Sequence, residues 1–319
     1  MNKTNFKSLL AQVDELTRSQ LGKLTKALES RSQALDSAKA LAAYEPTVCP
    51  HCGSKELVRN GVQNGLQRFI CKGCSKTCCA TTATPLARLK NKGLLAGYAQ
   101  CLSAGLTIRE TSAKLDMTVD RAFRWRHRML EMPVGHQPRP VQGLLEIDET
   151  YFQRSEKGSR KLSRPARGHG GMTSGSGRLA SEWVPVLVGR VRGQAYTFDK
   201  VLKRMDKAEV ATALRPSVDC EATMLCSDAH KTFLTMEKEL KVSCQFFVES
   251  EKKQEGLHVN NVNNYHERLK TWVNYRLRGV ATKYLPHYLA WQRLRTWGKG
   301  PISASDVIGS ALGHQLINV

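Results

Sequence analysis

Residues 144–152 read LLEIDETYF, an apolar run interrupted by acids. Its β-branched and aromatic side chains and its length predict a buried strand. Because side chains alternate across a strand, Asp148 is expected on the face opposite Ile147 and Glu149. An acid at the end of an apolar strand is costly unless it is paired, hydrogen-bonded or bound to a metal ion. This stretch therefore predicts a strand of a buried sheet that also carries a candidate site.

The sequence downstream predicts the rest of that sheet. Short runs rich in apolar and β-branched residues follow at 184–192, 194–201, 222–228 and 244–250. Helical patterns lie between and after them, at 207–218, at 229–242 and, as two long helices, from about 260 to 298. Three strands followed by alternating helix and strand are typical of a mixed sheet flanked by helices.

The strand predicted at 222–228 ends in a second acid, Asp228. If the two acid-bearing strands are neighbours, Asp148 and Asp228 would form half of a divalent-metal site for phosphoryl chemistry. The alternative is that each acid caps the helix that follows it, which a single strand-end Asp commonly does. The residues alone leave both interpretations open.

A polar face on the helix predicted after residue 260 supplies further candidates. Four polar residues have the spacing i, i+3, i+4 and i+7: Asn263, His266, Glu267 and Lys270. At about 100° per residue they lie on one face of the helix. This combination of an amide, an imidazole, a carboxylate and an ammonium indicates a site. The alternative is a solvated face, because the apolar residues of the helix are offset from these four.

Between the first two predicted strands lies a basic insertion, residues 153–183, rich in Gly and Ser. A segment of this composition cannot build a core, and we expect it to order on a phosphate backbone. A surface loop without a specific role is the alternative. The insertion residues predicted to contact DNA are Arg160, Lys161, Arg164 and Arg167.

Upstream, residues 89–132 have a helical period with a sharp break, typical of a helix-turn-helix. Ile108, Thr111 and Leu115 form an apolar face on the first helix, and a Pro-rich linker at 131–140 follows the second. An ordinary helical hairpin is the alternative. The second helix carries cations suited to phosphates and base edges in a major groove: Arg121, Arg124, Arg126 and Arg128.

Two Cys-x-x-Cys pairs, separated by eighteen residues, precede this region: Cys49 with Cys52, and Cys71 with Cys74. The segment between them alternates like two strands around an Asn-Gly turn, and Gly53 and Gly73 are expected to form the turns of the two knuckles. Four thiolates on such a hairpin predict a structural, tetrahedral Zn²⁺ in a zinc ribbon, with no open position for catalysis. Cys78 and Cys79 lie outside this frame and are expected to be packing residues.

The chain as a whole is basic, with 49 Lys and Arg against 28 Asp and Glu and a formal net charge of +21. This surplus predicts a polyanionic partner, because neutralised phosphates release condensed counterions. A hydrophobic content of 41% is ample for a core and excludes a disordered chain. Without a signal-peptide core or a run of eighteen apolar residues, we expect no membrane association and a cytoplasmic, nucleoid-associated location.

These patterns predict a multidomain α+β/α/β protein of 319 residues. Its predicted parts, in order, are a helical arm at 1–44, a zinc ribbon at 45–88, a helix-turn-helix region at 89–132, a catalytic domain at 141–300 and a tail at 301–319. One helix is expected over residues 5–42 of the arm, either packed on its own protein or available for self-association.

Blocks along nearly the whole chain resemble transposases of insertion-sequence family fifteen-ninety-five, which are encoded by bacterial mobile elements. The blocks are the ribbon, TPLARLK, the helix-turn-helix, EIDETYF, RPARGHGG, VPVLVGR, LCSDAHKTF, VNNYHERLK and GVATKYLPHYLAWQR. The resemblance implies a ribonuclease H-like fold and a DDE-type set in which the third ligand is Asn, followed seven residues later by Lys. Position by position, the implied catalytic residues are Asp148, Asp228, Asn263 and Lys270, with Glu267 as a candidate backup acid.

The resemblance also implies the activity, which is binding of the terminal inverted repeats, metal-dependent DNA cleavage and strand transfer into target DNA. Mg²⁺ or Mn²⁺ would be held by Asp148, Asp228 and Asn263, and Zn²⁺ would be structural. The implied partner is double-stranded DNA, on which a homo-oligomer would act. A DNA-binding regulator with an inactive nuclease-like body is the alternative, and an enzyme acting on RNA is a third interpretation.

Overall fold

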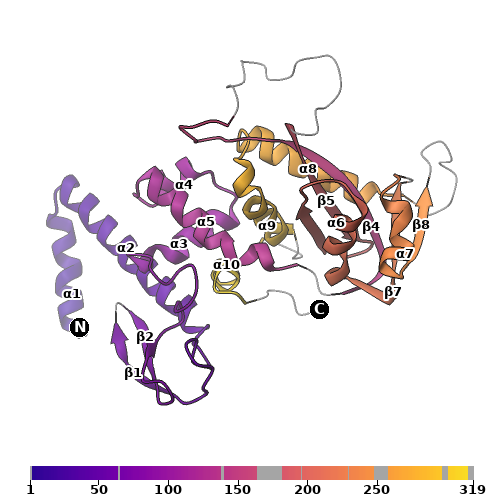
Figure 1. The fold of residues 1–319 in the computed structure, drawn as a ribbon. Coiled ribbons are helices and arrows are strands. Elements are labelled where there is room, and N and C mark those ends of the chain that lie inside the picture. Colours follow the sequence, from indigo (N-terminus) through magenta and orange to yellow (C-terminus); the bar gives the residue numbers. More distant parts are fainter. Residues whose placement is uncertain are drawn as a thin grey trace. The chain divides into compact units, whose positions relative to one another are not determined.

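The computed structural model describes residues 2–63, 65–137, 140–163, 182–194, 196–228, 230–247, 258–296 and 301–314 (Figure 1). These residues form two compact units. The first runs from the N-terminus to Trp125 and includes the segment that starts at Ser303, and the second runs from Arg126 to Ile302.

The second unit is built on a five-stranded sheet with the strand order β6-β5-β4-β7-β8. The strands are β4 (Val141–Gln153), β5 (Trp183–Val191), β6 (Thr197–Val201), β7 (Val218–Asp228) and β8 (Ser243–Phe247). β4 pairs antiparallel with β5, and β5 with β6, whereas β4, β7 and β8 run parallel. The sheet is therefore mixed, as the sequence predicts, and the stretch 144–152 lies in its central strand.

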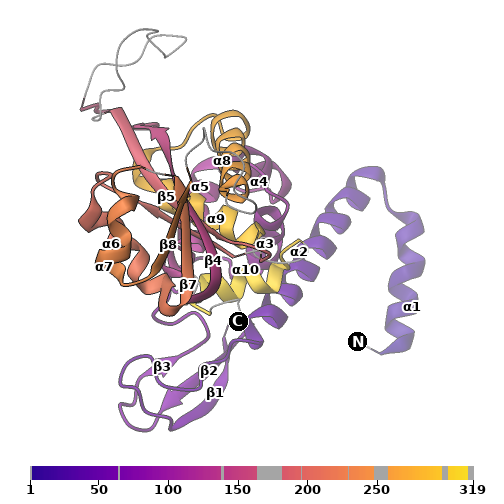
Figure 2. The same cartoon turned by 90° about the vertical axis from the view of Figure 1, so that its right-hand side faces the viewer.

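Helices cover both faces of this sheet (Figure 2). They are α6 (Lys207–Leu214), α7 (Met236–Leu240), α8 (Asn260–Thr271) and α9 (Leu285–Thr296). α6 and α7 close one face, over an apolar core that includes Leu145 and Ile147 of β4. α8 packs on β4 and β5, and α9 packs on β6. Since side chains alternate along β4, Glu146 and Asp148 point away from that core, toward α8.

The helix predicted at 229–242 is shorter in the structure, and the helix that begins at residue 260 changes to a π-helix near its end. The pattern at 229–242 yields a single 3-10 turn followed by the short helix α7, which ends at Lys241 in the left-handed region with φ of 56°. α8 continues as a π-helix over Trp272–Arg276. The chain then turns at Arg278 and Gly279, both with positive φ, before α9 begins.

The first unit combines helices with a small antiparallel sheet of order β1-β2-β3. Its strands are β1 (Leu57–Gln63), β2 (Leu66–Cys71) and β3 (Thr77–Cys78). Its helices are α1 (Lys3–Ala11), α2 (Arg18–Ala42), α3 (Leu95–Ser103), α4 (Ile108–Lys114), the start of α5 (Val119–Gly135), and α10 (Ala304–Ala311). α4 and α5 are joined by a four-residue turn.

The predicted single helix over 5–42 is wrong, because the arm contains two helices separated by a 3-10 turn. Thr17 and Gln20 form a capping box that starts α2. The Thr17 hydroxyl oxygen accepts from the Gln20 N–H, and the Gln20 side chain accepts from the Thr17 N–H at 2.9 Å. These two bonds satisfy N–H groups that a helix start leaves unpaired, and so they favour a new helix at this point.

Residues 301–319, predicted as a tail, include α10, which packs on α2 and α3. The Tyr44 hydroxyl donates to the Ser305 carbonyl at 3.2 Å. A Cβ atom at Gly309 would lie 2.3 Å from the Tyr44 hydroxyl oxygen, so only glycine permits this approach. The segment after residue 303 therefore completes the core of the first unit.

α5 extends into the predicted linker, through Pro133 to Gly135. Pro133 lies in the last turn, where its missing N–H removes one intrahelical hydrogen bond, and the helix ends two residues later. The Arg293 guanidinium donates to the carbonyls of Pro133 and Val134, at 3.0 and 3.3 Å, and so satisfies the end of the helix. No helix among the described residues is long and apolar enough to span a membrane.

Candidate active site and cysteine cluster

Asp148 and Asp228 lie on the two neighbouring parallel strands at the middle of the sheet. Glu146 of β4 is paired in register with Cys226 of β7. Two residues further along each strand, Asp148 and Asp228 reach the same level. This is the adjacency on which the metal-site interpretation depends.

The electrostatics of Asp148 reflect that neighbourhood. Burial, together with the charges of Glu149 and Asp228, raises the pKa of its carboxyl to about 7, and Lys270 opposes the shift. One stabilising contact is the Glu149 N–H, which donates to Asp148 Oδ1 at 2.8 Å. Because the neighbouring negative charges oppose the ionisation of Asp148, a cation is favourable at this position.

α8 turns its polar face toward these acids. His266 Nδ1 lies 3.7 Å from Asp148 Oδ2. Burial, with a contribution from Lys270, lowers the pKa of His266 to about 4, so this imidazole is neutral at pH 7. Asn263 lies one turn earlier on the same face and is exposed, as is Glu267. The structure thus places Asp148, His266 and Lys270 close together, with Asn263 on the adjoining turn.

Glu149 is an acid of this region to which the sequence analysis gives no role. Burial raises the pKa of its carboxyl, and the charge of Asp228 raises it further, while His230 lowers it. Its Oε2 atom is buried and has no hydrogen-bond partner among the described residues.

A buried ion pair, which the sequence did not predict, lies next to the site. Glu146 is fully buried, and its Oε1 atom accepts from Arg192 Nε at 2.8 Å. The same carboxylate contacts Asn261 at the start of α8. The available signal was a second acid in an apolar strand, two residues before Asp148 and therefore on the same face.

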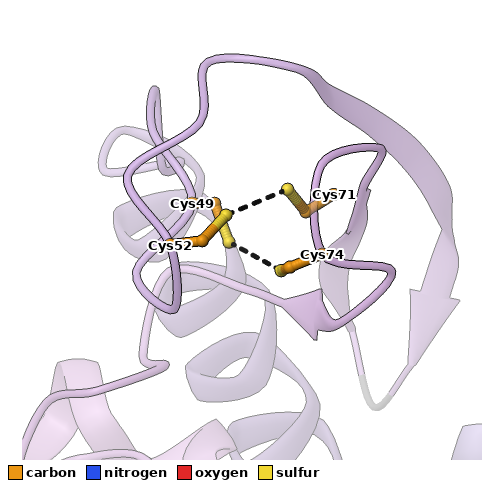
Figure 3. Close-up of side chains that lie close together, drawn as sticks. All are labelled: Cys49, Cys52, Cys71 and Cys74. Atoms are coloured by element: carbon orange, nitrogen blue, oxygen red, sulfur yellow. Dashed lines mark hydrogen bonds between the residues drawn. The ribbon is translucent and has the colours of Figure 1, made fainter.

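The four cysteines of the two predicted pairs form one cluster (Figure 3). The sulfur atoms of Cys49 and Cys74 are 3.7 Å apart, and those of Cys52 and Cys71 are 3.6 Å apart. Zn–S bonds of about 2.3 Å in a tetrahedron require S···S separations of roughly 3.8 Å. The donor set and its spacing therefore fit Zn²⁺.

The knuckle turns differ in part from the prediction. Gly53 has the positive φ expected, at 77°, but in the second knuckle the residue with positive φ is Ser75, at 55°. Gly73 serves another purpose, because a Cβ atom there would lie 3.2 Å from Ser54 Cβ. Gly73 thus lets the two knuckles approach each other.

Cys78 and Cys79 lie beside the cluster and differ in burial. Cys78 is buried, in agreement with a packing role. Cys79 is half-buried and lines a cavity of about 910 Å³ between α2, the hairpin and residues 89–93. Its sulfur contacts the Thr82 hydroxyl at 3.6 Å.

Among the arginines of α5, Arg126 is misassigned as a DNA contact. Its side chain is fully buried, and its guanidinium lies 4.3 Å from the centroid of the Trp291 ring. A cation over an aromatic face is a stabilising packing contact. Arg126 is a core residue of the second unit.

The other predicted DNA contacts are at least partly exposed where they are described. Arg124 is exposed and paired with Asp120, and Arg121 and Arg128 are half-buried. In the basic insertion, Arg160 and Lys161 are exposed, whereas Arg164 and Arg167 lie outside the described residues.

Known proteins with related sequences give the class of this domain. Residues 140–295, from the start of β4 to the end of α9, match the family model of the ISXO2-like transposase domain, so this part of the chain is a transposase domain. A Halobacterium salinarum protein, "Uncharacterized protein in transposable element ISH50", is 26% identical over 253 residues, which cover 77% of this chain and 84% of the relative. Both matches support the transposases of insertion-sequence family fifteen-ninety-five as the family of this domain, as the sequence blocks predict.

Solved structures align more weakly. The catalytic core domain of BIV integrase has 14% identity and a TM-score of 0.31, over 53% of this chain and 94% of that chain. The simian T-cell lymphotropic virus intasome has 12% identity and a TM-score of 0.31, over 66% of this chain and 74% of that chain. The Mos1 transposase paired-end complex has 11% identity and a TM-score of 0.22, over 69% of this chain and 79% of that chain. Similarities at these TM-scores support no conclusion about this chain.

Proposed function

We propose that this chain is a DDE-type transposase that cleaves DNA at the ends of a bacterial insertion sequence and joins those ends to target DNA. The observation that carries the proposal is the position of Asp148 and Asp228 at one level of adjacent parallel strands, beside the face of α8 that bears Asn263 and Lys270. The family match supports the same class of reaction. The domain would have a ribonuclease H-like fold.

Asp148, Asp228 and Asn263 would hold the catalytic Mg²⁺ or Mn²⁺. Carboxylate and amide oxygens are the donors that these hard cations take, and the mutual charge repulsion at Asp148 favours a cation there. When bound, the metal would activate the attacking water or 3′-hydroxyl and stabilise the leaving oxygen. A neutral amide as third donor should give weaker metal binding than a third carboxylate would.

The side chains around the two acids would orient the Asp148 carboxylate and bind the DNA. Lys270 would neutralise a nonbridging phosphate oxygen or hold the DNA end, since its ammonium is a compact point charge. His266, kept neutral by burial, packs against the Asp148 carboxylate and would restrict its rotation. Glu267, exposed on the neighbouring part of the helix face, would be a reserve acid.

The first unit would recognise the element ends. Zn²⁺ held by the cysteine cluster would fix the ribbon, and α4 with α5 would act as a helix-turn-helix in a major groove. The protein would work as a homo-oligomer on double-stranded DNA at the nucleoid. The cations proposed to contact DNA are Arg121, Arg124, Arg128, Arg160, Lys161, Arg164 and Arg167.

The test is incubation of full-length protein with labelled element-end DNA in Mg²⁺, Mn²⁺ or EDTA. Nicking and joining are expected with either metal and not with EDTA. Asp148→Ala and Asp228→Ala should each abolish cleavage and leave end binding intact, because they remove metal ligands and no DNA contact. Cleavage by either variant contradicts the assignment. Binding without nicking by the wild type would favour the regulator, and preferential binding of RNA would favour an RNA enzyme.

A further inference from the structure

The helix that carries the proposed third ligand does not cap itself. α8 begins after Val259, which offers no side-chain acceptor, and its first turn contains no acid. A helix start leaves several N–H groups without intrahelical partners, and these normally need a capping side chain. Asn263 lies at the end of this first turn, so its position depends on what holds the turn in place.

Glu146 of β4 supplies the missing cap. Its Oε2 atom accepts from the Asn261 backbone N–H at 3.0 Å, and its Oε1 atom accepts from the Asn261 side-chain amide at 2.7 Å. A carboxylate at this end also complements the positive pole of the helix dipole. The strand that carries Asp148 therefore also fixes the start of α8.

Arg192 completes this arrangement. Its Nε donates to Glu146 Oε1 at 2.8 Å, and its Nη2 donates to the His258 carbonyl at 2.9 Å. The buried carboxylate is thus paired with a cation, as a buried charge must be. The same guanidinium holds the residues that lead into α8.

A lysine holds the other end of the helix. The Lys157 ammonium, four residues beyond the end of β4, donates to the carbonyls of Leu277, Arg278 and Gly279, at 3.1, 2.9 and 2.8 Å. These carbonyls follow the π-helical extension of α8. A cation at the carbonyl end of a helix satisfies unpaired acceptors and complements the negative pole of the dipole.

We infer that Glu146 and Lys157 are positioning residues, which hold α8 at both ends and set Asn263 and Lys270 against Asp148. The inference rests on the proposed function, because it takes those three as site residues. A helix rises about 1.5 Å per residue, whereas metal-ligand distances tolerate only about 0.2 Å. A small slip of α8 would therefore remove Asn263 from a metal shared with β4.

Substitutions of the residues that hold the two ends of α8 should have different effects. Glu146→Gln should weaken Mn²⁺ binding to the full-length protein about tenfold, the usual scale for residues that orient metal ligands. Lys157→Met should leave Mn²⁺ affinity near that of the wild type and slow single-turnover nicking at saturating metal about tenfold, because Lys270 lies nearer that end. Lys238→Met, an exposed lysine of α7, is the matched control and should change neither.

Double variants distinguish positioning from general destabilisation. The Glu146→Gln effect on Mn²⁺ affinity should vanish in an Asn263→Ala background, and the Lys157→Met effect on nicking should vanish in a Lys270→Ala background. Additive losses, or single variants that behave like the wild type, would overturn the inference. If Glu146→Gln fails to fold, Asn261→Ala tests the same contact, since that residue is exposed. Unchanged Mn²⁺ affinity in Asp148→Ala would instead contradict the proposed function.

Discussion

The ionised carboxylate of Asp148 destabilises the folded protein when no cation is bound beside it. Burial is the main cause that raises the pKa of its carboxyl to about 7, well above the ordinary value of 3.8. Between about pH 4 and pH 7, the Asp148 carboxyl is therefore protonated in the folded state and ionised in the unfolded state. Stability falls as pH rises through this window, and the cost is complete above pH 7.

Asp148→Asn should accordingly raise the melting temperature of the metal-free protein at pH 8 and not at pH 4. The amide removes a charge that is penalised only when the carboxyl is ionised, and the gain should be on the order of 1–3 kcal/mol. Thermal unfolding in EDTA at both pH values measures it. Mg²⁺ at pH 8 should stabilise the wild type and leave the variant unchanged. An equal gain at pH 4 and pH 8 would show that the effect is not electrostatic.

Gly73 affects the cysteine cluster because it has no side chain. Gly73→Ala should hasten the loss of Zn²⁺ to a chelator, because the new Cβ would lie 3.2 Å from Ser54 Cβ and would push the knuckles apart. Release can be followed with a colorimetric zinc indicator. Gly22→Ala is the control, since a Cβ there meets nothing within 4 Å. Equal release rates for the two variants would contradict the role given to Gly73.

At the level of elements, we expect the sheet β1-β2-β3, the proposed ribbon, to depend on its cysteine cluster more than on a core. Nearly all of β1 is exposed, and β2 buries only Phe69 and Cys71. A sheet this small cannot offset the entropy of ordering by burial alone.

Zinc removal should therefore unfold β1 to β3 and leave the five-stranded sheet of the second unit intact. Cys49→Ser, or treatment with a chelator, should abolish preference for element ends while Mn²⁺ binding at the acidic site persists. Hydrogen exchange resolved by segment provides the measurement. Protection of the ribbon amides that survives metal removal would contradict this dependence.

The elements also show what local sequence can and cannot predict. The strands and the cysteine pairs were predictable, because alternation and ligand spacing are local patterns. The capping of α8 by Glu146, the burial of Arg126 under Trp291 and the packing of α10 on α2 were not. Each of these depends on a partner more than one hundred residues away, which no local pattern encodes.

For the molecule as a whole, the surplus of cations is informative only once buried and exposed charges are separated. The net charge of +21 includes Arg126, Arg192 and Arg293, which are wholly or largely buried and bind groups within the fold. We expect the exposed remainder to release counterions from DNA, the partner proposed above. Substitutions at the two kinds of site should therefore have separable effects.

Replacing Arg160 and Lys161 together by Gln should weaken binding to element ends and to unrelated DNA by similar factors. Each lost phosphate contact lowers the slope of log K against log salt by about one, so the double variant should lose roughly two. Arg126→Gln should instead lower the melting temperature and leave that slope unchanged, because its guanidinium packs on Trp291. Fluorescence anisotropy across a salt series measures both. An unchanged slope in the double variant would place the DNA-binding charge elsewhere on the molecule.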